Sequence, residues 1–181
     1  AGIMPTLSVL YVPDYVAPRS RIVLVNALVK RLEQAFPCFR VTLAVSEGPF
    51  EDMEGTRSHF DGNTMSFKKP EKRVAQTRVD FQVAIAQLSR NVCYHTPKLI
   101  IGHGQGALVA YGYARPYVLE RSMQSRNIQR REVQAIGEAW GKVQAIVGLN
   151  PRMYKKGLML EIFKPAMPEF FMKKCPIPAV R

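Results

Sequence analysis

The sequence has few of the residues from which metal sites and disulfide frameworks are built. Only three cysteines occur among 181 residues, Cys38, Cys93 and Cys175, and no two of them form a C-x-x-C motif. This scarcity argues against a zinc site and against a disulfide scaffold. We expect buried, reduced thiols in an intracellular reducing compartment, with no metal and no cofactor.

Long apolar runs are also absent. No stretch of about 18 uncharged apolar residues occurs, which is the length that a membrane-spanning helix requires. We therefore expect no membrane partner. Apolar residues nevertheless make up 47% of the chain, enough to build the core of one domain.

Acidic residues are scarce relative to basic ones, and the net charge is +12. Residues 1–106 carry 13 basic and 9 acidic side chains, whereas residues 107–181 carry 13 and 5. Such an excess favours an anionic partner, and nucleic acid is the commonest of these. The alternative is a solvated basic surface with no dedicated ligand.

Apolar periodicity indicates strands that alternate with helices. Strands are expected at 7–12, 39–45, 98–103 and 143–151. Helices are expected at 20–36, 71–92, 107–114 and 117–141. This alternation predicts a three-layer α/β fold, with a mainly parallel sheet and helices on both faces.

Two segments lack a clear period. Residues 46–70 are polar and contain glycines, so we expect a long loop, which is usually functional or mobile. Residues 152–181 are basic and apolar and contain several prolines. We expect one domain over residues 1–151, and a tail that packs either on that domain or on a protein partner.

The most distinctive stretch is "LIIGHGQGALVAYGYA", residues 99–114, in which a strand passes through a tight turn into a helix. Within it, "GHGQG" resembles the nucleophile elbow, G-x-S-x-G, of the α/β-hydrolase superfamily. Gly102 and Gly106 match the flanking glycines, and Gly104 replaces the serine. "VLYVPDYVAPRSR" resembles the family's early strand and oxyanion loop, and "VQAIVGLNP" resembles the strand after the elbow. The resemblance covers about residues 7–151 and implies the first half of such a fold.

The departures from the family pattern concern the catalytic groups. Gly104 has no hydroxyl with which to attack a carbonyl. The family's acid and histidine follow the nucleophile, yet this sequence has no Asp and no His after Gly106. Pro13 and Asp14 stand where the family often has His-Gly. We therefore expect no catalytic residues and a non-catalytic scaffold or binding module, in which Gly104→Ser is tolerated.

Two alternatives remain open. One is an esterase-like hydrolase whose catalytic residues come from another chain or from a missing segment. The other is a dinucleotide-binding domain, because Gly102, Gly104 and Ala107 fit G-x-G-x-x-A, with Glu120 as the acidic residue downstream. A purely structural role for the glycines, which permit positive φ and close packing, is the simplest interpretation.

Candidate site residues follow from these interpretations. His103 and Gln105, with the three glycines of the elbow, are candidates for binding a ligand, although His103 is expected to be hydrogen-bonded in place. Candidates for nucleic-acid binding are the basic residues Arg121, Arg126, Arg130, Arg131, Lys155 and Lys156. Arg126 and Arg130 would share one face of a helix, and a merely solvated face is the alternative.

Overall fold

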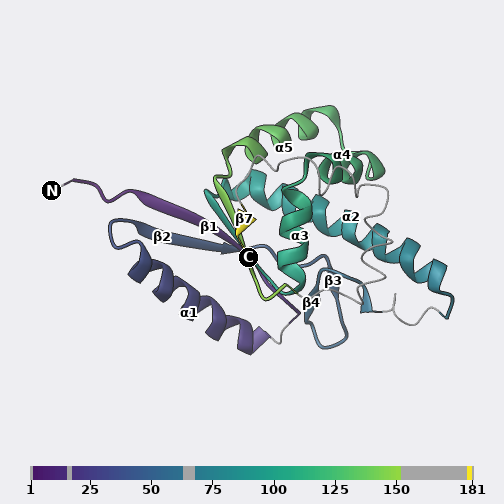
Figure 1. The fold of residues 1–181 in the computed structure, drawn as a ribbon, viewed down its shortest axis with the longest axis horizontal. Coiled ribbons are helices and arrows are strands. Elements are labelled where there is room, and N and C mark those ends of the chain that lie inside the picture. The colour runs from purple at the N-terminus through teal and green to yellow at the C-terminus, as the bar shows by residue number, and fades with distance from the viewer. Residues whose placement is uncertain (1, 16–17, 63–67, 152–178, 181) are drawn as a thin grey trace.

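Five parallel strands form the centre of the molecule, in the order β2-β1-β5-β6-β7 (Figure 1). The computed structural model describes residues 2–15, 18–62, 68–151 and 179–180. The strands are β1 (Thr6–Val12), β2 (Arg40–Val45), β5 (Leu99–His103), β6 (Ala145–Leu149) and β7 (Ala179–Val180).

Helices cover both faces of this sheet. On one face lies α1 (Pro18–Ala35); on the other lie α2 (Pro70–His95), α3 (Gln105–Tyr113), α4 (Pro116–Ser125) and α5 (Arg130–Lys142) (Figure 1). Strand alternation produces this division, because Val9 and Tyr11 pack toward α1 while Leu10 and Val12 pack into the core beneath α2 and α3. The predicted three-layer α/β fold is confirmed.

The chain changes direction across the sheet between β1 and β5. From β1 it moves to one side to form β2, and from β5 it moves to the other side to form β6. In open α/β sheets, ligands bind outside the carboxyl ends of the strands at such a switch point. A ligand site is therefore expected at the segments that follow β1 and β5.

The predicted helix over residues 117–141 is wrong in one respect, because the structure contains two helices there. Asn127 lies between α4 and α5 with a φ of 49°, a left-handed conformation that asparagine tolerates better than most residues and that breaks the helix. Arg126 caps α4, whereas Arg130 begins α5. The two arginines therefore do not share a helical face.

Residues 46–70 also differ from the expected irregular loop. They include a short antiparallel hairpin, β3 (Phe50–Glu51) paired with β4 (Arg57–Ser58). Asp52 organises its turn, since its Oδ1 accepts hydrogen bonds from the backbone N–H groups of Glu54 at 2.9 Å and Thr56 at 2.8 Å. A two-residue strand is too short to show a period in sequence.

The cysteine prediction is partly wrong. Cys93 is half-buried, and burial is the main cause that raises the pKa of its thiol, but Cys38 is exposed in the turn between α1 and β2. Both thiols are free. Cys175, Lys155 and Lys156 lie outside the described residues. Within the described part of the chain, no helix is both long and apolar enough to span a membrane.

Candidate functional site at the carboxyl ends of β1 and β5

The turn between β5 and α3 is sharp and centres on Gly104. Its φ of 57° and ψ of −116° are those of the first central residue of a type II′ turn, a conformation that residues with a Cβ rarely adopt. The N–H of Gly104 donates to the carbonyl of Leu149 at 3.0 Å, which ties the turn to the end of β6. The predicted positive φ at this glycine is confirmed.

The flanking glycines allow the backbone segments to approach closely. A Cβ built at Gly106 would overlap the carbonyl oxygen of Val12, and one at Gly102 would overlap the backbone of Ala107. Each of these positions must therefore be glycine if β1, β5 and α3 are to keep their spacing. The close strand–helix packing expected at the elbow glycines is confirmed.

Asp14, the second residue after β1, fills the space in front of the elbow. Its side chain is buried, and its Oδ1 accepts a hydrogen bond from the backbone N–H of Gln105 at 3.0 Å. That N–H begins α3, so the carboxylate also lies at the positive end of the helix dipole. A Cβ at Gly104 would overlap this carboxylate. This overlap and the positive φ argue against the expectation that Gly104→Ser is tolerated, because the serine would have to displace Asp14.

The same carboxylate bears on dinucleotide binding. In a G-x-G-x-x-A site, the pyrophosphate occupies the helix N-terminus after the glycines. Here Asp14 accepts the first N–H of α3 and would repel a phosphate. The proposed acidic partner, Glu120, lies within α4 rather than at the end of a strand. Both observations disfavour a dinucleotide at this turn.

The hairpin β3–β4 is fastened to the elbow through Gln105. The Oε1 atom of this buried side chain accepts hydrogen bonds from the hydroxyl of Ser58 at 3.0 Å and from the N–H of His59 at 3.3 Å. The Nε2 of His59 lies 2.9 Å from the carbonyl oxygen of Pro13. Because a carbonyl can only accept, Nε2 carries the proton.

Burial keeps His59 neutral. Desolvation is the largest influence and lowers its pKa to about 4, against smaller opposing effects from the Pro13 carbonyl and the Asp14 charge. At neutral pH the ring therefore holds one proton and uses it to bind Pro13. Its role here is to join the hairpin to the segment after β1.

His103 lies on the other side of the turn and contacts Tyr11. The Nδ1 of His103 and the hydroxyl of Tyr11 are 3.3 Å apart, and both residues belong to strands of the sheet. Burial is the main cause that raises the pKa of the Tyr11 hydroxyl, so the phenol stays protonated and can donate to the ring. The expectation that His103 is hydrogen-bonded in place is confirmed.

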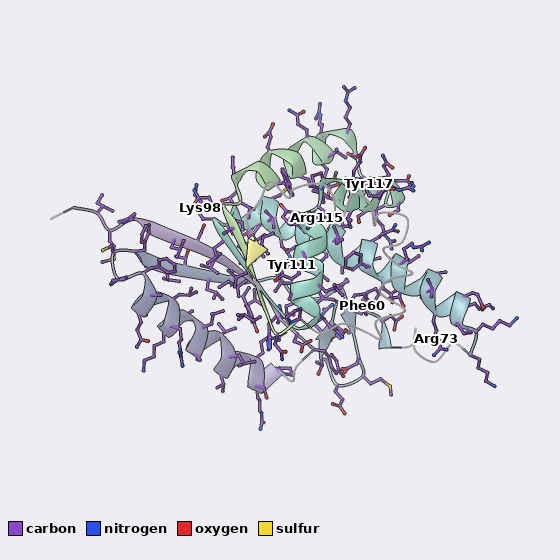
Figure 2. All side chains as sticks on the ribbon, viewed as in Figure 1. Phe60, Arg73, Lys98, Tyr111, Arg115 and Tyr117 are labelled. Atoms are coloured by element: carbon purple, nitrogen blue, oxygen red, sulfur yellow. The ribbon has the colours of Figure 1, made fainter. Side chains whose placement is uncertain are left out.

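A cavity of about 360 Å³ opens beside the elbow, between the hairpin and the segment after β1. We call it the hairpin cavity. Its buried lining includes Ser58, Phe60 and Gln105. Figure 2 shows Phe60 beside the hairpin, toward the opposite end of α3 from Arg115 and Tyr117. Of the five elbow residues chosen from sequence, Gln105 is the one that reaches this cavity.

The four candidate arginines in the described part of the chain are exposed and surround the turn between α4 and α5: Arg121, Arg126, Arg130 and Arg131. Arg121 lies over the ring of Tyr117, 5.7 Å from its centroid. The Nη2 of Arg126 donates to the carbonyl of Val79 in α2 at 3.4 Å. Neither of these contacts involves a residue of the elbow.

Sequence reasoning missed Ser58 and His59, and it recorded Asp14 only as a departure from a motif. The first two come from a segment without periodicity, so nothing in the sequence placed them beside the elbow.

Across the described residues, no group of three His, Cys, Asp or Glu side chains is arranged to hold a metal ion. None of the known protein families and curated proteins compared with this sequence matches it.

Proposed function

We propose that the chain is a non-catalytic, α/β-hydrolase-like binding module. The observation that carries this proposal is the position of Asp14. Its carboxylate lies in front of Gly104, where a hydrolase of this kind has its nucleophile, and it accepts the N–H of Gln105. In that family, the N–H of the residue after the nucleophile helps to stabilise the oxyanion.

Several features support the likeness to the hydrolase family. The turn follows a central parallel strand, leads directly into a helix and has the strained dihedral angles that a nucleophile elbow requires. β1 pairs with β5, so the segment after β1 lies where the family's oxyanion loop would lie. These features concern the backbone alone, and the residue at the nucleophile position, Gly104, has no reacting side chain.

Asp14 also weighs against a hydrolase completed by another chain. A nucleophile delivered from outside would need the Gln105 N–H for the developing oxyanion, but a fixed negative charge already accepts that N–H. The incoming acyl group would meet the same carboxylate. The absence of a nucleophile at Gly104 and the occupied oxyanion donor both argue against acyl transfer at this turn.

The test is acyl transfer by the wild-type protein. We expect no turnover of short-chain aryl esters and no labelling by a serine-directed phosphonate. Any labelling that does occur should be assigned to a residue by mass spectrometry. Ser58→Ala is the control for labelling at the serine that lines the hairpin cavity. Turnover above background that the phosphonate abolishes would overturn the proposal.

A second candidate function is nucleic-acid binding, by the chain or by an assembly that contains it. The observation that favours it is the exposure of Arg121, Arg126, Arg130 and Arg131 around one interhelical turn. Clustered arginines neutralise backbone phosphates and need no base contacts to do so. This function would use a different surface from the elbow, so the two candidates can be tested separately.

A further inference from the structure

The charged residues that line the hairpin cavity have one sign. Glu51, Asp52 and Asp61 line it, and no lysine or arginine does so among the described residues. The chain as a whole carries a net charge of +12, so this concentration of acid runs against the general bias. Arg57 pairs with Glu51 at 2.9 Å from outside the lining, and Asp52 and Asp61 are the other two carboxylates of the lining.

Aromatic rings line the same cavity. Tyr15 and Phe50 contribute to its walls, and the buried ring of Phe60 stacks on Phe81 with centroids 6.2 Å apart. The faces of aromatic rings attract cations, and more strongly where water is excluded. Rings and carboxylates together therefore favour a positively charged ligand with some apolar surface.

The carboxylate of Asp52 is fixed before any ligand arrives. The Tyr15 hydroxyl donates to its Oδ2 at 2.6 Å, and two backbone N–H groups hold its Oδ1. The Tyr15 hydrogen bond is the largest cause that lowers the pKa of Asp52, so this side chain is ionised at neutral pH. A charge held in one place costs little entropy when it binds a ligand.

The volume and place of the cavity suit a small ligand. About 360 Å³ falls within the usual range for ligand sites, which runs from about 300 to about 1,000 Å³. Gln105 and Tyr15 place it beside the carboxyl ends of β5 and β1, at the switch point of the sheet. Both the lining of the cavity and its position in the fold are therefore typical of a ligand-binding site.

We infer that the hairpin cavity binds an organic cation that carries N–H donors, an alkylguanidinium or alkylammonium group. The carboxylates of Asp52 and Asp61 would accept its N–H groups, and the rings of Phe50 and Tyr15 would contact its alkyl portion and its charge. This inference rests on the proposed binding function and specifies its ligand class.

The test compares two probes that differ in charge and little in shape. Arginine methyl ester is titrated into the protein beside citrulline methyl ester, in which a neutral urea replaces the guanidinium, and binding is followed by amide chemical shifts. We expect arginine methyl ester to bind about tenfold more tightly, because only the cation gains the charge-assisted hydrogen bonds and ring contacts. Shifts should be largest at the amides of residues that line the cavity.

Three variants locate the site. Asp61→Asn should weaken binding of arginine methyl ester about fivefold, since it removes one anionic partner. Phe50→Leu keeps an apolar side chain but removes the ring, and it provides a second test if Asp61→Asn folds poorly. Glu33→Gln, an exposed residue of α1, makes the same change of charge far from the cavity and should leave the affinity unchanged.

Equal affinity for the two probes, or no binding of either, would overturn the inference. So would an equal loss of affinity in Asp61→Asn and Glu33→Gln, because that would indicate a general effect of net charge. The proposed function fails on a different result, namely acyl transfer. A protein that neither hydrolyses esters nor binds arginine methyl ester would retain the proposed function and refute its ligand class.

Discussion

Asp14 and Gln105 lie 91 positions apart in the chain and meet at the N-terminus of α3, where the Asp14 Oδ1 accepts the Gln105 N–H at 3.0 Å. This contact combines a helix cap with a buried carboxylate at the switch point of the sheet. It joins the segment after β1 to the turn after β5, and the hairpin is held to the same two segments through Gln105 and Pro13.

Removing the cap should destabilise the protein. Asp14→Ala deletes the acceptor for the Gln105 N–H and leaves the start of α3 without its negative charge, so unfolding should become easier by about 1–2 kcal/mol. Asp14→Asn keeps an acceptor oxygen and should cost less. Urea denaturation measures both; equal stability of Asp14→Ala and the wild type would show that the contact contributes nothing.

Gln105→Ala should loosen the hairpin as well as lower stability. Its buried Oε1 accepts two hydrogen bonds from residues 58 and 59, and their loss leaves buried donors unpaired at a cost of about 1–3 kcal/mol. Amide exchange should speed up at His59. Gln134→Ala, on the exposed surface of α5, is the matched control and should leave the exchange of His59 unchanged.

Stability should fall as the pH is lowered from about 6.5 to about 4 because of His59. Its folded pKa, about 4, lies below the ordinary value of 6.5, so the unfolded chain binds the extra proton in this window. The total loss is about 3 kcal/mol by this linkage. His59→Gln should flatten the pH profile of the urea midpoint. An unchanged profile in His59→Gln would contradict the burial of this ring.

If the four arginines near the α4–α5 turn bind phosphates, affinity for nucleic acid should decline steeply with salt. Four contacts predict a slope of log K against log salt of about −3. Changing Arg126, Arg130 and Arg131 to Gln should reduce that slope by about 2. A triple change on the opposite layer, Arg19, Lys30 and Arg31 to Gln in α1, removes the same charge. Equal loss in both triple variants would mean that net charge alone drives binding.

Four strands of the sheet, β1, β2, β5 and β6, and most helices could be predicted because their residues alternate or recur at helical spacing. The two-residue β7 lies in the segment for which no period was found. β1, for example, is a short β-branched and aromatic run that ends before Pro13; its last residue is the predicted one, and its first lies one position earlier than predicted. The break between α4 and α5 could not be predicted in the same way. It depends on the left-handed conformation of Asn127. Asparagine tolerates this conformation but also adopts others, so its presence alone does not predict where a helix breaks.

The candidate site was only partly predictable. The glycine pattern identified the turn, since close backbone approach and positive φ require residues without a Cβ. The partners of the turn come from elsewhere in the chain. Asp14 meets it because β1 pairs with β5, and Ser58 and His59 meet it because a hairpin with two-residue strands folds back onto Gln105. Such contacts depend on tertiary packing and leave no local pattern.

The most direct measurement of the central claim, that the Asp14 carboxylate fills the elbow at Gly104, is a double-mutant cycle of unfolding free energies. Gly104→Ala should cost at least about 1–3 kcal/mol in the wild-type background, because a Cβ is strained at a φ of 57° and also displaces Asp14. In the Asp14→Ala background the same change should cost about 1–2 kcal/mol less, since the displaced contact is already gone. Additive costs within about 0.3 kcal/mol would contradict the claim.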